Sequence, residues 1–146
     1  MPSASFQHSL SVDATRDQVW KALMDPETWA HIGPVNKVWD PEFDGEILSG
    51  YQWSTEIGSR DFNGTANVIE HSAPDRYAID LDAGEMAGTI DITLSDGNPT
   101  TDLDVTLDFR TKGMLSAMFW PIIKDAIGKG LPGQMEDFAT TLSQGD

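Results

Sequence analysis

Few residues of this 146-residue chain titrate near neutral pH by default, and these few are scattered along it. The chain has three histidines, the residue type that titrates near neutral pH, and no cysteine. Disulfides, thiolate metal sites and cysteine nucleophiles are therefore excluded. The histidines fall on different predicted elements, and none has a second ligand at the spacing of a zinc site. We therefore expect neither a metal nor a cofactor.

His31, His71 and Arg60 are the candidates for polar contacts with a bound molecule. His31 would serve as a proton donor or ligand contact, or alternatively as a surface or capping residue. His71 ends a predicted strand beside a turn, and the same two interpretations apply. Arg60 would contact a ligand carboxylate or enolate, or pair with one of the chain's own carboxylates. The sequence contains no nucleophile elbow, phosphate loop or paired-glutamate motif, so no catalytic residue is assigned.

Large apolar side chains indicate a different kind of site, a cavity for an apolar molecule. Flat rings and flexible methionines suit an apolar ligand of variable shape. The alternative is that the same side chains fill a solid core. A kink expected at Pro121 and the difficulty of packing many large rings without gaps favour the cavity. The candidate lining residues are Trp39, Trp53, Tyr77, Phe109, Met114, Met118, Phe119 and Ile122.

The elements that position these residues begin with a strand and two short helices. Residues 5–12 alternate apolar and polar side chains at period two, as a half-buried strand does. Thr15 with Gln18 three positions on predicts the capping box of a first helix. Asp25 followed by Pro26 predicts the start of a second helix, which must be short because Gly33 and Pro34 follow.

The middle of the chain, residues 35–110, has the pattern of about six strands separated by turns. Tyr51, Trp53 and Thr55 share one face of a strand. In the last strand, apolar residues at 103, 105, 107 and 109 alternate with polar ones, which predicts a sheet covered on one side only. The aspartates expected on the solvated face are Asp80, Asp82, Asp91, Asp102, Asp104 and Asp108.

Residues 114–142 carry apolar side chains at helical spacing, which predicts a long amphipathic helix that covers the sheet. Pro121 and the glycines and proline at 128–133 predict that this helix is kinked or split.

The net charge of −15, from 24 acidic and 9 basic residues, opposes binding to nucleic acid and to anionic membrane surfaces. It is typical of a highly charged, solvated surface, and adaptation to high salt or a basic protein partner are the alternatives. No apolar run reaches the length of a membrane span, and no signal-peptide pattern is present. We expect a cytoplasmic protein without stable membrane insertion.

The segment VDATRDQVWKALMDPETW at residues 12–29 resembles the opening of the SRPBCC (START-like) superfamily, and NGTA at 63–66 with EHSAPDR at 70–76 resembles its central hairpin. The polyketide cyclase/dehydrase-like branch is the nearest. The resemblance implies a single domain, residues 1–146, with the α+β helix-grip fold. In that fold a curved antiparallel sheet of six to seven strands wraps around a long C-terminal helix, and two short helices follow the first strand. It also implies a cavity between sheet and helix, with His31 in a loop over its mouth.

Three hypotheses of function follow from this resemblance. The first is binding of a small hydrophobic molecule such as a lipid, isoprenoid, quinone or polyketide-like ring. The second is an enzyme of the polyketide cyclase/dehydrase type. The third is a partner-regulating protein of the chaperone-activator or toxin type, although FATTL at 138–142 lacks the tryptophan usual at the end of chaperone activators. Whether the chain is an enzyme is left open.

Overall fold

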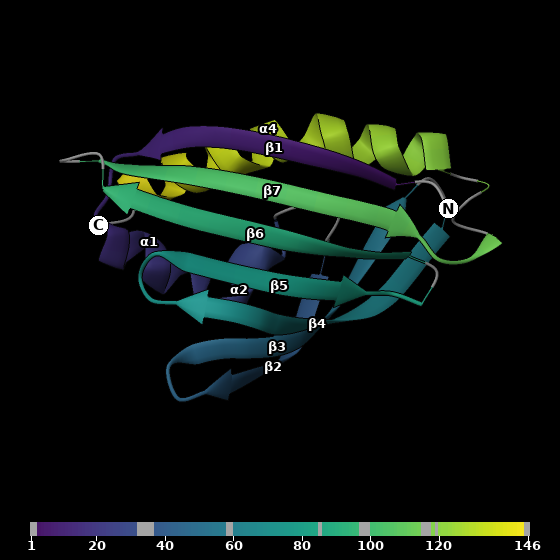
Figure 1. The fold of residues 1–146 in the computed structure, drawn as a ribbon, viewed down its shortest axis with the longest axis horizontal. Coiled ribbons are helices and arrows are strands. Elements are labelled where there is room, and N and C mark those ends of the chain that lie inside the picture. Colours follow the sequence, from purple (N-terminus) through teal and green to yellow (C-terminus); the bar gives the residue numbers. More distant parts are fainter. Residues whose placement is uncertain are drawn as a thin grey trace.

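In a computed structural model of the chain, seven antiparallel strands form one curved sheet with its helices on one face (Figure 1). The structure describes residues 3–31, 37–57, 60–84, 86–96, 100–114, 118 and 120–144, apart from a few side chains within these ranges. The elements are β1 (Ser3–Val12), α1 (Arg16–Leu23), α2 (Pro26–Trp29), β2 (Lys37–Asp44), β3 (Ile47–Ile57), β4 (Arg60–Ser72), β5 (Arg76–Asp82), β6 (Met86–Asp96), β7 (Thr101–Thr111) and α4 (Trp120–Gln144).

The strand order β1-β7-β6-β5-β4-β3-β2 brings the first strand beside the last one and leaves β2 at the opposite edge. The predicted architecture is confirmed: an α+β helix-grip fold with two short helices after the first strand and a long C-terminal helix. The period-two pattern is also confirmed, most clearly in β7, where Leu103, Val105, Leu107 and Phe109 are buried while Asp102, Asp104 and Asp108 are exposed.

Two glycines of the sheet lie under aromatic rings of neighbouring strands. A Cβ atom on Gly64 would stand 2.5 Å from the Asp82 carbonyl oxygen and 2.8 Å from the Trp53 ring. A Cβ atom on Gly88 would stand 2.5 Å from the ring of Phe109, its partner in register. Only glycine permits this close approach, and glycines at such points let a sheet curve strongly. Gly64 and Gly88 are therefore positions at which the sheet can curve.

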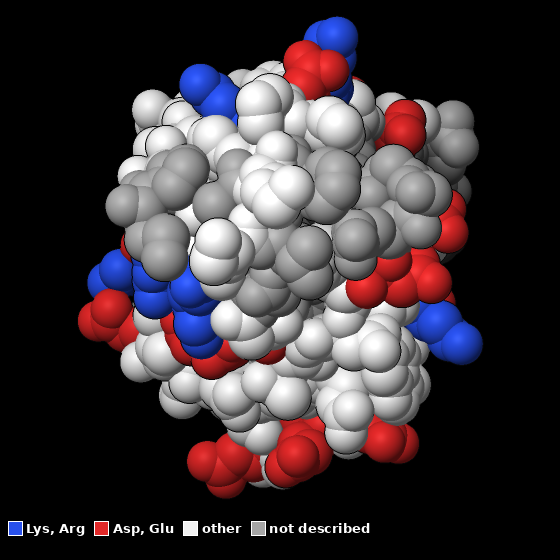
Figure 2. Space-filling model, turned by 90° about the vertical axis from the view of Figure 1, so that its right-hand side faces the viewer, with Lys and Arg blue, Asp and Glu red and all other residues white. Residues whose placement is uncertain are grey.

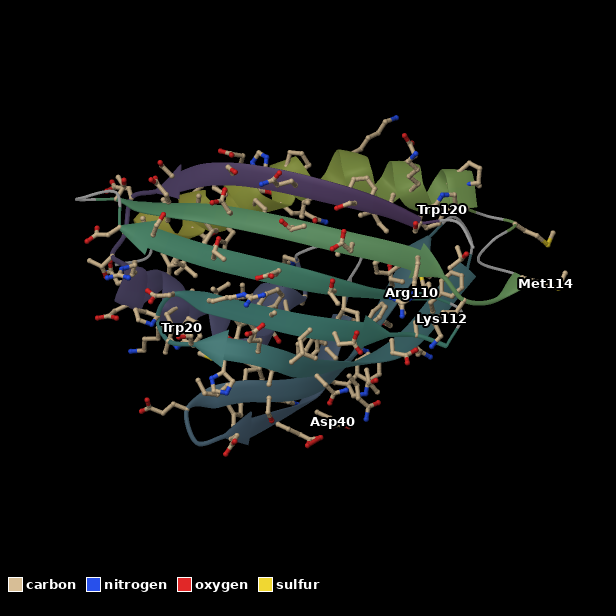
Figure 3. All side chains as sticks on the ribbon, in the orientation of Figure 1. Trp20, Asp40, Arg110, Lys112, Met114 and Trp120 are labelled. Atoms are coloured by element: carbon tan, nitrogen blue, oxygen red, sulfur yellow. The ribbon has the colours of Figure 1, made fainter. Side chains whose placement is uncertain are left out.

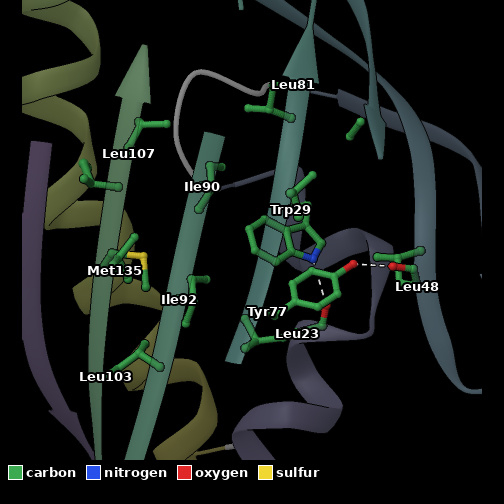
Figure 4. Packing of buried hydrophobic residues seen from close by; sticks show 14 of the residues in the cluster. Leu23, Trp29, Leu48, Tyr77, Leu81, Ile90, Ile92, Leu103, Leu107 and Met135 are labelled. Atoms are coloured by element: carbon green, nitrogen blue, oxygen red, sulfur yellow. Dashed lines mark hydrogen bonds between the residues drawn. The ribbon is translucent and has the colours of Figure 1, made fainter. Parts of the chain in front are cut away.

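The short helices α1 and α2 close one end of the sheet's inner face. The capping box is confirmed: Thr15 Oγ1 accepts a hydrogen bond from the backbone N–H of Gln18 at 3.2 Å, and Gln18 Oε1 accepts one from the backbone N–H of Thr15 at 2.8 Å. Trp29 of α2 is fully buried and donates from Nε1 to the Leu23 carbonyl at 2.8 Å. Its ring centroid lies 5.8 Å from that of Tyr77 (Figure 4). This end of the interior is thus densely packed with aromatic rings.

The long helix α4 lies along β1 at the other side of the inner face (Figure 1). Its buried residues among the described side chains are Ile127, Leu131, Met135 and Ala139, and a Cβ on Gly128 would stand 2.9 Å from the Phe6 ring of β1. Within the described helix α4, the break predicted at residues 128–133 does not occur, and the helix is continuous from Trp120 through the glycines and Pro132.

Pro121 is the second described residue of α4, and residues 115–117 and 119 before it lie outside the described residues, so the kink at Pro121 stays a prediction.

Candidate functional site

The inner face of the sheet is the candidate binding surface, and a row of residues across it alternates large and small side chains. Cross-strand register places Tyr51 opposite Ala66, Ala66 opposite Leu81, Leu81 opposite Gly88 and Gly88 opposite Phe109. All five are buried. The three large side chains are thus separated by positions that have a methyl group or no side chain at all.

The buried part of this inner surface carries no charged side chain among the residues that the structure describes. No Asp, Glu, Lys, Arg or His side chain there is buried, and the buried polar residues other than tyrosine and tryptophan are Thr55, Thr101 and Thr111. Burying an unpaired charge costs far more free energy than burying an apolar group. The surface is therefore suited to an uncharged, apolar molecule.

The two tyrosines of the chain differ in their hydrogen bonding, although both are buried. Tyr77 Oη donates to the Leu48 carbonyl (Figure 4). Tyr51 is 3% exposed, and its hydroxyl is the one buried side-chain oxygen or nitrogen without a hydrogen-bond partner among the described residues. Burial raises the pKa of both phenols above the usual value, and the neighbouring Tyr77 adds to the rise for Tyr51. Both phenols therefore stay protonated at neutral pH.

Three of the predicted lining residues lie on the inner face. Trp53, Tyr77 and Phe109 are at most 1% exposed. Trp53 donates from Nε1 to the Thr65 carbonyl at 2.9 Å, which fixes its ring across Gly64. Tyr77 lies at the end of the interior that α1 and α2 close, and its ring meets that of Trp20 edge-on, with centroids 5.8 Å apart.

Trp39 is not a lining residue, because the register of β2 turns it to the other face. It lies opposite the exposed Gln52, whereas its neighbour Val38 lies opposite the buried Trp53. Trp39 is only half-buried, and Lys37 Nζ lies 5.9 Å from its ring centroid. Side chains alternate between faces along a strand, so a shift of one residue exchanges inside for outside.

The structure also places the described lining candidates of the C-terminal segment on the surface. Met114 is 82% exposed, Met118 70% and Ile122 52%. In Figure 3 Met114 lies beyond the ends of the strands, so the sheet does not cover it. Phe119 lies outside the described residues. The end of the molecule that carries this segment has charged side chains mainly around its rim (Figure 2).

Of the predicted polar contacts, neither His31 nor His71 is buried at the inner face. His31 is exposed in the turn after α2, and His71 is exposed near the end of β4. Arg60 begins β4, and its side chain lies outside the described ones. The third histidine, His8 of β1, lies opposite the buried Val105, and its Nε2 is 3.1 Å from a carboxylate oxygen of Glu136 in α4. The described residues contain no cluster of three potential metal ligands.

A recess of about 390 Å³ opens to solvent where β1 begins and β7 ends. Its lining combines the buried Phe109 with the partly buried Ala4 and the exposed Asp108 and Arg110. Ser3 and Ser5 complete the described lining. Phe109 therefore belongs both to this recess and to the inner row described above.

Sequence reasoning missed Tyr51, Ala66 and Gly88 as site residues. The shared face of Tyr51 and Trp53 was visible in the alternation of β3. The pairing of small residues with large ones across strands was not visible, because it depends on register.

Comparison with known proteins identifies the fold. The family model described as polyketide cyclase / dehydrase and lipid transport matches residues 3–143. No curated protein matches the sequence. Among solved structures, a protein from Thermus thermophilus has a TM-score of 0.76 at 9% identity, over 98% of this chain and 99% of its own. A START superfamily protein from Mycobacterium smegmatis has a TM-score of 0.63 at 16% identity, over 92% of this chain and 98% of its own.

A third similar structure, a conserved protein from Geobacillus kaustophilus, has a TM-score of 0.64 at 18% identity, over 97% of this chain and 96% of its own. At these identities the likeness concerns the fold alone. None of the described helices has both the length and the apolar composition that a membrane crossing requires.

Proposed function

The chain belongs to the polyketide cyclase/dehydrase and lipid transport family, and from that premise we propose that it binds a small apolar molecule between the inner face of the sheet and α4. The observation that carries the proposal is the buried part of the inner face, which has no charged side chain among the described residues and on which small residues separate large ones. An apolar molecule gains about 25 cal/mol for each Å² of apolar surface that it buries there. Ala66, which has only a methyl group, is the position we propose for such contact, whereas the Phe109 ring lies over Gly88.

Binding is favoured over acid–base catalysis by the groups that the interior offers. A cyclase or dehydratase needs a side chain that takes up and releases a proton near the working pH. The buried phenols of Tyr51 and Tyr77 have pKa values raised by burial, so they act as hydrogen-bond donors and not as bases. His31 and His71 are exposed, and the partly buried His8 lies at the β1 edge of the inner face with its Nε2 3.1 Å from a Glu136 carboxylate oxygen.

The proposal is tested by filling the inner face at one small residue. Ala66 is 1% exposed on the inner face of β4, and its neighbour Asn67 is exposed on the outer face. We expect the wild-type protein to bind the neutral fluorophore Nile red, Ala66→Leu to bind it at least tenfold more weakly, and the matched control Asn67→Leu to bind it as wild type does.

Thermal unfolding of the three proteins distinguishes a binding cavity from a packed core. Adding methylene groups to a tightly packed core costs typically about 1–3 kcal/mol. The proposal is wrong if Ala66→Leu binds Nile red as tightly as wild type does. It is also wrong if wild type does not bind Nile red and Ala66→Leu is destabilised by this amount, because the interior is then a packed core.

A further inference from the structure

We propose that the bound molecule is uncharged and carries an oxygen atom that accepts a hydrogen bond from Tyr51 Oη. This inference rests on the proposed function and names the chemical class of its ligand. It assigns Tyr51 as the residue that orients the ligand on the inner face.

The first step of the argument is that the Tyr51 hydroxyl is an exception among the buried polar groups. Trp29 and Trp53 donate to the carbonyls of Leu23 and Thr65 at 2.8 and 2.9 Å. Thr101 Oγ1 donates to the Ala14 carbonyl at 2.7 Å. Tyr51 Oη has no such partner in the described part of the chain. Buried polar groups in native proteins are nearly always hydrogen-bonded, so an unsatisfied one requires an explanation.

The second step is the comparison with Tyr77, which is the same residue type in the same interior. Tyr77 reaches a backbone carbonyl of β3, whereas Tyr51, on that strand, reaches none. Tyrosine is therefore not needed at position 51 to satisfy the protein's own backbone. Phenylalanine would fill the same volume without the cost of an unsatisfied hydroxyl, and that cost indicates a partner supplied by the ligand.

The third step concerns the position of Tyr51 in the row of large and small residues. It stands directly opposite Ala66 and is followed on the same face by Trp53. A molecule packed over Ala66 would therefore lie beside the phenol ring of Tyr51.

The fourth step concerns charge and excludes ionised ligands. No charged side chain is buried among the described residues, so a carboxylate or phosphate placed beside Tyr51 would have no counter-ion. Because burial raises the pKa of Tyr51, its hydroxyl keeps its proton and acts as a donor. Ketones, quinones, esters and alcohols supply the matching acceptor oxygen, whereas hydrocarbons have none and carboxylates bring an unpaired charge.

The experiment compares three naphthalenes of similar size by calorimetric titration at pH 7.5: 2-acetylnaphthalene, 2-ethylnaphthalene and 2-naphthoate. We expect wild type to bind the ketone roughly tenfold more tightly than the ethyl compound, as one hydrogen bond predicts, and to bind the anion most weakly. Tyr51→Phe should bind the ketone and the ethyl compound equally. Tyr77→Phe is the matched control and should retain the preference for the ketone.

An infrared measurement detects the hydrogen bond itself, so it depends neither on the binding affinity nor on the stability of the control Tyr77→Phe. The carbonyl stretching frequency of bound 2-acetylnaphthalene should be lower in wild type than in Tyr51→Phe, because a hydrogen bond weakens the C=O bond. If the naphthalenes bind but the ketone preference or the frequency is unchanged in Tyr51→Phe, the inference is overturned and the proposed function stands. Tight binding of 2-naphthoate overturns the charge argument. If none of the three compounds binds, the proposed function itself fails.

Discussion

Removal of the Tyr51 hydroxyl should stabilise the ligand-free protein, whereas removal of the Tyr77 hydroxyl should destabilise it. Tyr51→Phe deletes a buried donor that has no partner among the described residues, and an unsatisfied buried polar group costs about 1–3 kcal/mol. Tyr77→Phe instead leaves the buried Leu48 carbonyl without its donor, so a cost of the same size, about 1–3 kcal/mol, appears in the variant. The same chemical change thus has opposite signs at two positions.

Urea denaturation measures both effects. Tryptophan fluorescence is a suitable signal, because Trp20 and Trp29 contact the Tyr77 ring. The midpoint should rise in Tyr51→Phe and fall in Tyr77→Phe, with the slope m unchanged if only stability differs. In thermal melts, about 2–4 °C per kcal/mol is expected for a chain near this length.

A fall in stability for Tyr51→Phe would refute this reasoning, because it would mean that the hydroxyl has a stabilising partner in the free protein. Equal and small effects in both variants would show that the two phenols do not differ in their surroundings. Circular dichroism should show the same secondary structure in all three proteins.

Three further predictions concern the fold and its pH dependence. Gly88→Ala should lower the free energy of unfolding by about 1–3 kcal/mol, because its Cβ would overlap the Phe109 ring. Gly133→Ala in α4 should raise it by about 0.5–1 kcal/mol, because nothing lies within 4 Å of the added Cβ. Thermal melts that show no difference between the two variants would contradict this. Thr15→Ala should lower stability by about 1 kcal/mol through loss of the α1 cap, measured by urea midpoint against the exposed control Thr140→Ala. Burial raises the pKa of the two tyrosines, so their contribution to stability is complete below about pH 10 and is lost as the pH rises above that value. The free energy of unfolding should fall less steeply with pH in Tyr51→Phe than in wild type, and equal slopes would refute this.

The sequence was sufficient to predict elements whose signals are local. The alternation in β7 and the capping box at Thr15 each depend on residues close in the chain, and the structure confirms both. The apolar periodicity of the last segment correctly predicted a long helix. It did not show where the sheet ends, and Met114 lies beyond that point.

Features that depend on register could not be predicted. Trp39 faces outward because β2 pairs with β3 so that Val38, and not Trp39, lies opposite Trp53. The pairing also shifts near Glu42, and Asp40 has a φ of 51°. None of these irregularities has a distinct sequence signal.

The difference between the two tyrosines was equally hidden from sequence. Both stand in alternating strands among apolar neighbours. Only the three-dimensional arrangement shows that one phenol meets a backbone carbonyl and that the other meets none in the described chain.

Native mass spectrometry of the protein purified from its own cells tests the central claim most directly. Gentle ionisation preserves a non-covalent complex, and organic extraction then releases the bound molecule for identification. The account predicts a 1:1 complex with a small, uncharged, oxygen-containing apolar molecule, whose occupancy is reduced in Ala66→Leu and in Tyr51→Phe. A spectrum that shows only the bare chain, both as purified and after incubation with 2-acetylnaphthalene, would contradict it.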